Sequence, residues 1–195
     1  YKKKEVIFHS RSRTKTVYFV YSGEVMLYNL TKHGNRKVIF ILGKGQLLNQ
    51  SIVSKKPNAL FCEAACPVKV IEIAEEQFLH LMEQSHALTR AVLREYERNL
   101  WRMGHQLKNT TGNMQMERKI AAKLWKLGRD FGVDTEDGVM IDIDLTITLM
   151  ADLVGAPREN VSRACKVLTD RGLIRYGNKR FTLADSDGLA EFYKM

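Results

Sequence analysis

Residues Thr146–Gly172 read TITLMADLVGAPRENVSRACKVLTDRG, and the second half of this stretch has the two faces of an amphipathic helix. At about 100° per residue, its apolar side chains fall on one side and predict a core stripe. They are Val161, Ala164, Cys165 and Leu168. The opposite side carries side chains that can hydrogen-bond base edges or phosphates in the major groove of DNA. They are Arg158, Glu159, Ser162, Arg163 and Lys166.

The residues before this helix predict a second short helix that is joined to it by a tight turn. Thr146 or Thr148 can cap that first helix. Gly155 follows its last apolar residue, where a left-handed conformation favours glycine, and Pro157 suits the first turn of the next helix. Helix, glycine turn and helix form the helix-turn-helix pattern, whose second helix enters the major groove by its N-terminal end.

A short hairpin is predicted directly after the second helix, in the position of a wing. Residues 173–176 and 181–183 are strand-like, and Gly177-Asn178 is a turn signal. Lys179 and Arg180 at its tip suit phosphate contacts. Residues 156–182 hold seven Lys and Arg against two Asp and Glu, so this segment is locally basic.

The composition of the whole chain is weaker evidence for a nucleic-acid partner than the basic segment at residues 156–182. The net charge of +9 favours a polyanionic partner, but the excess is spread along the 195 residues. No apolar run is long enough to span a membrane, and the three cysteines suit a reducing compartment, so we expect a cytoplasmic protein. The chain begins inside a strand-like segment, so we expect further residues before Tyr1. The sequence contains no glycine-rich phosphate loop, no nucleophile elbow and no pair of histidines at metal-binding spacing, so we do not expect an enzyme.

The first part of the chain is predicted to be a β-barrel or jelly roll. Between residues 5 and 73, short apolar segments alternate with turn signals such as Ser22-Gly23, Gly34-Asn35 and Gly43-Lys44-Gly45. The apolar segments are Val6–Phe8, Val17–Val20, Val25–Leu30, Val38–Leu42, Leu60–Cys62 and Val68–Ile73.

Two helices are predicted after the barrel, at residues 75–86 and 87–110. The longer one has a narrow apolar stripe at steps of four and three, as in a coiled coil. The stripe consists of Leu88, Val92, Tyr96, Leu100, Met103 and Leu107. We interpret it as a dimer seam; the alternative is that it packs on its own barrel. A polar hinge at residues 109–114, which contains Gly112, and a helix at residues 117–129 follow.

This order of elements resembles the CRP/FNR family of bacterial transcription regulators over nearly the whole chain. Lys4–Phe8 and Val17–Val25 resemble the opening of that family's barrel, and Arg158-Glu159 with Arg163 matches its CRP-type reading triad. Glu159 with Ser162-Arg163 also matches the FNR-type pattern. The resemblance implies an α+β fold with a jelly-roll sensor domain at residues 1–86, a dimerisation helix and hinge at 87–112, and a winged helix-turn-helix at 113–195.

The resemblance further implies a homodimer that reads a two-fold symmetric operator with half-sites near TGTGA or TTGAT. RNA polymerase is the further partner that we expect. Arginine is the best bidentate donor to guanine and glutamate can accept from cytosine, which assigns Arg158 and Arg163 to guanine or phosphate and Glu159 to cytosine. The alternative is that Glu159 and Arg163 form only a surface pair four residues apart.

The effector is not expected to be cAMP bound as in the family's cyclic-nucleotide members. Those members use a Gly-Glu turn and an Arg-Ser pair, and the aligned residues are Gln50-Ser51 and Asn58-Ala59. Gln50 replaces the glutamate and Asn58 the arginine, and a buried phosphate without a cationic partner is unfavourable.

The cysteines and one histidine are the residues that bear on other cofactors, and they identify none. An iron–sulfur cluster needs about four thiolates and is not expected from three cysteines. Cys62 and Cys66 are either a redox pair on one strand face or two small buried side chains. Haem stays open because some relatives carry it, and His105 on the long helix is the residue that would face an effector.

The sequence therefore predicts a dimeric regulator that an unidentified small effector controls through the barrel. Two alternatives stay open. One is an effector-independent DNA-binding dimer with a scaffold barrel. The other is a sensor module that regulates a partner enzyme, which would leave residues 146–183 without a purpose.

Overall fold

The computed structural model describes residues 1–110 and 114–194 and divides into two compact units. The first unit comprises Tyr1–Gly34 and Val38–Lys108, and the second comprises Asn35–Lys37 and Asn109–Met195.

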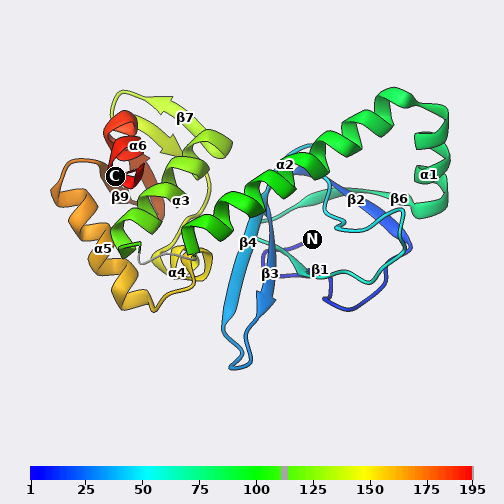
Figure 1. Cartoon of the computed structure of the whole chain (residues 1–195), viewed down its shortest axis with the longest axis horizontal. Coiled ribbons are helices and arrows are strands. Elements are labelled where there is room, and N and C mark those ends of the chain that lie inside the picture. Colours follow the sequence, from blue (N-terminus) through cyan, green and yellow to red (C-terminus); the bar gives the residue numbers. More distant parts are fainter. Residues whose placement is uncertain (111–113, 195) are drawn as a thin grey trace. The chain divides into compact units, whose positions relative to one another are not determined.

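The first unit is built from six antiparallel strands in two sheets (Figure 1). The strands are β1 (Val6–Phe8), β2 (Thr16–Ser22), β3 (Val25–Leu30), β4 (Arg36–Leu42), β5 (Phe61–Ala64) and β6 (Lys69–Ala74). One sheet has the order β1-β5-β3-β4, and the other pairs β2 with β6. This arrangement is the jelly roll that the alternation of short apolar segments predicts.

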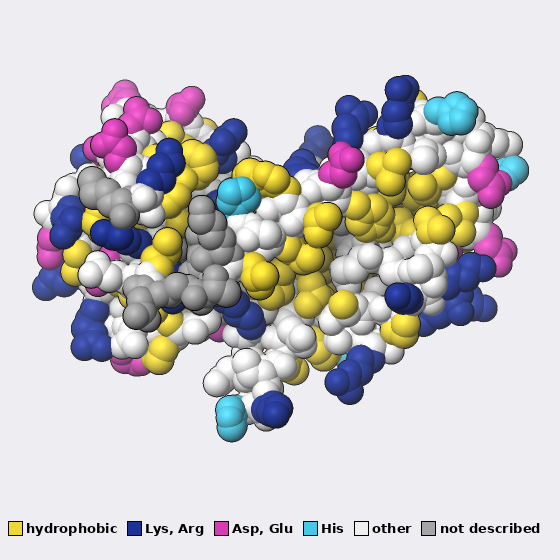
Figure 2. All heavy atoms as spheres, viewed as in Figure 1, with side chains coloured by type: hydrophobic (Ala, Val, Ile, Leu, Met, Phe, Trp, Pro, Cys, Tyr) yellow, Lys and Arg dark blue, Asp and Glu magenta, His cyan; other side chains and the backbone are white. Residues whose placement is uncertain are grey.

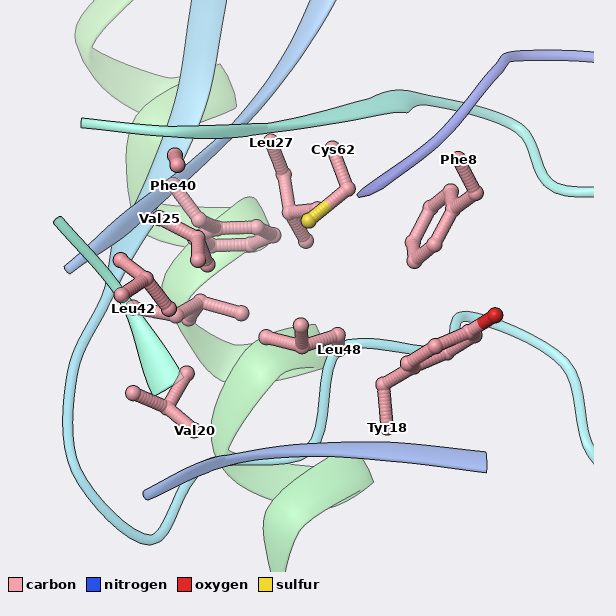
Figure 3. Close-up of a cluster of buried hydrophobic side chains, with 11 residues drawn as sticks. Phe8, Tyr18, Val20, Val25, Leu27, Phe40, Leu42, Leu48 and Cys62 are labelled. Carbon is pink, nitrogen blue, oxygen red and sulfur yellow. The ribbon is translucent and has the colours of Figure 1, made fainter. Parts of the chain in front are cut away.

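The core of the first unit lies between the two sheets. Alternate side chains of each strand point inward because successive residues of a strand face opposite sides. Figure 3 shows Phe8, Tyr18, Leu48 and Cys62 converging there from separate segments. All four are buried, so Cys62 acts as a small apolar residue of this core.

Two helices follow the barrel: α1 (Glu75–Gln84) and α2 (His86–Thr110). Phe78 of α1 and Val92 of α2 are buried together with Val17 and Leu47 in a second apolar cluster. Leu81 of α1 is exposed. The predicted hinge around Gly112 lies outside the described residues.

The second unit packs helices on a four-stranded antiparallel sheet. The helices are α3 (Met116–Phe131), α4 (Ile147–Val154), α5 (Arg158–Asp170) and α6 (Ser186–Lys194). The strands are β7 (Gly132–Thr135), β8 (Gly138–Ile141), β9 (Ile174–Gly177) and β10 (Arg180–Leu183), in the order β7-β8-β10-β9. Ile120, Leu124 and Leu127 of α3 are buried, as their spacing predicts.

The structure confirms the predicted fold class: a jelly roll, a long helix and a winged helix-turn-helix. It adds two elements that the sequence did not predict, the exposed strand β7 and the C-terminal helix α6. Within residues 1–110 and 114–194, no helix is long and apolar enough to cross a membrane.

Candidate nucleic-acid interface

Helix α4 has a capping group at each of its ends, and the second one begins the turn to α5. The backbone N–H of Leu149 donates to Thr146 Oγ1 over 3.1 Å, so Thr146 rather than Thr148 caps α4. Gly155 has φ +74° and ψ +48°, and its N–H donates to the carbonyl of Ala151. This left-handed conformation explains the glycine. Pro157 caps α5 from one position before its first residue, so our placement of Pro157 inside the helix was off by one.

The two faces of α5 differ completely in burial. The predicted apolar side chains are buried: Val161, Ala164, Cys165 and Leu168. The predicted reading residues are exposed to solvent: Arg158, Glu159, Ser162, Arg163 and Lys166. The helix ends at Asp170; Gly172, two residues beyond it, has φ +72°, and the N–H of Leu173 donates back to the carbonyl of Leu168. The helix is thus fixed by its apolar side and presents its polar side outward.

Arg163 has a partner that the sequence analysis missed. Its Nη2 donates to Asn160 Oδ1 over 2.6 Å, three residues earlier on the same helix. The sequence analysis weighed only Glu159 as a partner, four residues earlier. The signal that could have found Asn160 is the (i, i+3) spacing of an amide and a guanidinium on the exposed face.

The wing turns through two residues in left-handed conformation. Arg180 pairs with Gly177 across the hairpin, so the loop residues are Asn178 and Lys179, with φ of +49° and +60°. Positive φ at both positions is the geometry of a type I′ turn. The predicted turn signal Gly177-Asn178 lies one residue earlier. The carbonyl of Lys179 accepts from the N–H of Leu145 over 2.7 Å, which ties the tip to the segment before α4.

The two basic side chains of the wing tip differ in their partners. Lys179 is exposed. The Nη2 of Arg180 lies 3.1 Å from Asp142 Oδ1, just after β8, and both side chains are about half exposed. A surface pair of this kind contributes about 0–1 kcal/mol, so a phosphate can compete with it.

Replacing Asp142 tests whether this pair restrains the wing. We expect Asp142→Asn to strengthen binding to duplex DNA and to steepen the dependence of log K on log salt by up to about one unit, because Arg180 then contacts the phosphate without competition from a carboxylate. Binding titrations at several salt concentrations measure the slope. The same change in an Arg180→Ala background serves as the control and should leave the slope unaltered. Equal slopes for Asp142→Asn and the parent chain would contradict the prediction.

The predicted seam of α2 divides between two surroundings. Val92 is buried against the barrel, Leu88 and Tyr96 pack on the same cluster, and the Tyr96 hydroxyl donates to the carbonyl of Asn49 over 3.4 Å. These three residues therefore pack on the chain's own barrel, which is the alternative interpretation of the stripe. Leu100, Met103 and Leu107 are exposed instead.

Other apolar side chains on α2 are exposed beside the second half of that stripe. They are Leu93 and Trp101. Figure 2, viewed as Figure 1, shows hydrophobic side chains at the surface where α2 runs. Leu93, Leu100 and Leu107 recur every seventh residue, on a face of the helix that neighbours the face of Val92. A Cβ added at Gly104, between the last two leucines, would meet no heavy atom of the described chain within 4 Å.

The four predicted effector residues in the barrel are uncharged, and the two lysines between them, Lys55 and Lys56, are exposed. Gln50 donates from Nε2 to the carbonyl of Leu48 and accepts at Oε1 from the N–H of Leu60. Ser51 Oγ lies 2.8 Å from Ser54 Oγ. Asn58 is buried, and its Nδ2 has no hydrogen-bond partner among the described residues, whereas Ala59 is exposed.

His105 is not on the barrel side of α2. It is exposed and lies against Trp101, with a ring-centroid distance of 4.0 Å. The barrel side of this turn is formed by Arg102, whose guanidinium lies over Phe40, and by Gln106, which donates to the carbonyl of Ile39. The structure therefore does not bring His105 together with the other candidate effector residues.

The cysteines do not share one strand face. Cys62 is in the core on β5, and burial raises its pKa. Cys66 lies beyond the end of that strand, and its thiol donates to Glu24 Oε2 over 2.9 Å. Burial, and then the bond to Glu24, raise the pKa of Cys66 to about 11. Both sulfurs are protonated thiols at neutral pH, which makes them weak nucleophiles.

A winged helix-turn-helix with an exposed basic helix face, joined in sequence to a jelly roll by a long helix, defines a class of transcription regulators. Two family descriptions match the chain. Residues 1–85 match the cyclic nucleotide-binding domain, and residues 118–192 match the Crp-like helix-turn-helix domain. The chain belongs to the CRP/FNR family and is a CRP-like transcription regulator with a DNA-binding helix-turn-helix.

Proteins similar to this chain include a cAMP-activated regulator and a nitrogen regulator. The CRP-like cAMP-activated global transcriptional regulator of Mycobacterium tuberculosis H37Rv is 25% identical over 175 residues, 89% of this chain and 78% of that protein. The global nitrogen regulator of Nostoc is 23% identical over 186 residues, 94% of this chain and 83% of that protein. The structure of FixK2 from Bradyrhizobium japonicum has a TM-score of 0.84 at 20% identity, covering 98% of this chain and 93% of that one, and shows the shared fold.

Proposed function

We propose that this regulator acts as a homodimer that reads a two-fold symmetric operator with the exposed face of α5. The observation that carries the proposal is the division of α5 between four buried apolar residues and five exposed polar residues at the predicted positions. Arg158 and Arg163 would donate to guanine or an adjacent phosphate, and Glu159 would accept from cytosine. The other exposed polar residues would contact the DNA phosphates or a base: Ser162 and Lys166 of α5, and Lys179 and Arg180 of the wing.

The proposed dimer contact is the stripe of Leu93, Leu100 and Leu107 on α2, with a second copy of this chain as its partner. A heptad repeat of leucine keeps one side of a helix facing a parallel neighbour. Gly104 costs about 1 kcal/mol in a helix interior, and no neighbouring atom in the described chain requires it. Close approach of a second helix accounts for it. Two α5 helices set one DNA turn apart, about 34 Å, would then meet successive major grooves.

The barrel is proposed to respond to an effector other than cAMP. The Gln50 amide is occupied by backbone groups, and the position of the family's arginine holds the neutral, buried Asn58. A phosphate there would lose its water without gaining a cation. Control by an effector would be a population shift between two arrangements of the dimer, and RNA polymerase stays a predicted partner. The effector-independent alternative differs only in lacking that shift.

Selection of DNA from a randomised duplex pool tests the proposal. We expect the purified chain to enrich an inverted repeat. Arg163→Ala should weaken binding to the selected duplex by about 1–3 kcal/mol and lose preference at one base pair of each half-site. Fluorescence anisotropy with the selected duplex and its single-base variants measures both quantities.

Two controls sharpen this experiment. Lys44→Ala removes an exposed basic residue from a turn of the barrel and should leave the affinity for DNA unchanged. Addition of cAMP should also leave it unchanged. Equal enrichment of all sequences, or a weakening by Arg163→Ala that is the same for every base, would contradict base reading by this residue.

A further inference from the structure

The contact between Arg163 and Asn160 joins an arginine that we assign to base reading with a neutral acceptor on the same helix. The Nη2–Oδ1 distance is 2.6 Å. Arg163 is exposed, whereas Asn160 is half-buried in the first turn of α5, where its N–H lies 3.1 Å from the carbonyl of Pro157. The acceptor is therefore held by the helix end while the guanidinium projects outward.

We infer that Asn160 is a positioning residue that sets the base preference of Arg163 by holding its guanidinium before DNA arrives. The inference rests on the proposed function, in which Arg163 meets a base. A free arginine side chain samples many rotamers, and ordering it at an interface has an entropic cost. A hydrogen bond made in the free protein reduces that cost, as preorganisation does in general.

The chemistry of the amide suits this role better than that of a carboxylate. Asn160 accepts from one N–H of the guanidinium and leaves the full positive charge and the other N–H donors for a guanine edge. A carboxylate would bind the guanidinium more strongly and compete with guanine for it. Because Asn160 orients Arg163, the carboxylate of Glu159 is not needed for that task and stays available to a cytosine amino group.

Direct base reading by Asn160 is the competing explanation. Asparagine pairs with adenine through Oδ1 and Nδ2 together, which would require Oδ1 to leave Arg163. The two explanations differ in the base pair that Asn160 affects. A positioning residue alters the pair that Arg163 reads, whereas a direct reader alters another one.

The test compares Asn160→Ala, Arg163→Ala and the double variant on the selected duplex and on every single-base variant of its half-site. We expect Asn160→Ala to reduce discrimination about twofold to tenfold at the base pair that Arg163→Ala affects, and to have no effect once Arg163 is alanine. Asn160→Asp keeps an acceptor but adds a carboxylate that competes with guanine for Arg163, so it should weaken binding and reduce preference at the same base pair. Thermal unfolding of each variant checks that the domain is folded.

Each outcome has one meaning. Loss of preference at a different base pair, additive with Arg163→Ala, would overturn the inference and make Asn160 a direct reader. Unchanged discrimination in a folded Asn160→Ala would overturn it as well. If Arg163→Ala itself leaves every base preference intact, the proposed function fails rather than the coupling between the two residues.

Discussion

Leu100→Glu is expected to turn the proposed dimer into a monomer and to weaken operator binding by about 10²-fold or more. Leu100 is 68% exposed in the protomer and lies in the middle of the stripe that we assign to the second copy. A carboxylate in a helix–helix seam loses water without gaining a partner. Once the two reading helices are separated, the gain from binding two half-sites together, about 10²-fold to 10⁴-fold, disappears. Sedimentation velocity and anisotropy titration measure the two effects.

Leu81→Glu is the matched control for this variant. Leu81 is also an exposed leucine on a helix of the first unit, but it lies on α1, outside the stripe. Its replacement should leave both the dimer and the DNA affinity intact. A Leu100→Glu chain that still sediments as a dimer would show that the contact between copies is made elsewhere.

The sequence alone could not place this seam because two different partners require the same spacing. An apolar stripe at steps of three and four forms whether a helix packs on its own barrel or on another helix. On α2, the residues that pack on the barrel and the residues that we assign to the second helix lie on neighbouring faces. Val92 is buried by the barrel, while Leu93 beside it is exposed. Only the contacts of the folded chain separate Leu88, Val92 and Tyr96 from Leu100 and Leu107.

The helix-turn-helix was far easier to predict, because its signals are local. Thr146, Gly155 and the stripe from Val161 to Leu168 act within a few residues of their own position. The pair of Arg180 with Asp142 joins residues far apart in sequence and depends on how β10 lies beside β8. Strand β7 (Gly132–Thr135) is exposed, and its sequence has no alternation of apolar and polar residues that would predict a strand. Long-range pairing and weakly patterned edges were therefore the parts that the sequence did not reveal.

Leu168→Ala should destabilise the second unit by about 2–5 kcal/mol, because it leaves a cavity where a fully buried side chain packed. Leu168 belongs to α5, and its carbonyl also accepts from the N–H of Leu173 at the helix end, a backbone bond that the substitution keeps. Chemical denaturation of the intact chain, followed by the fluorescence of Trp125 on α3, measures the loss. Val167→Ala on the same helix is the control, since Val167 is exposed and its replacement should cost little.

Leu168→Ala also distinguishes the roles of the two faces of α5. At temperatures where Leu168→Ala is folded, its base preferences should match those of the parent chain, because every exposed residue of the helix is unchanged. Arg163→Ala should do the opposite, altering base preference with little effect on stability, since it removes an exposed side chain. A Leu168→Ala chain that is as stable as the parent would mean that this flank is not packed in solution. The polar flank would then lack the support that orients it toward DNA.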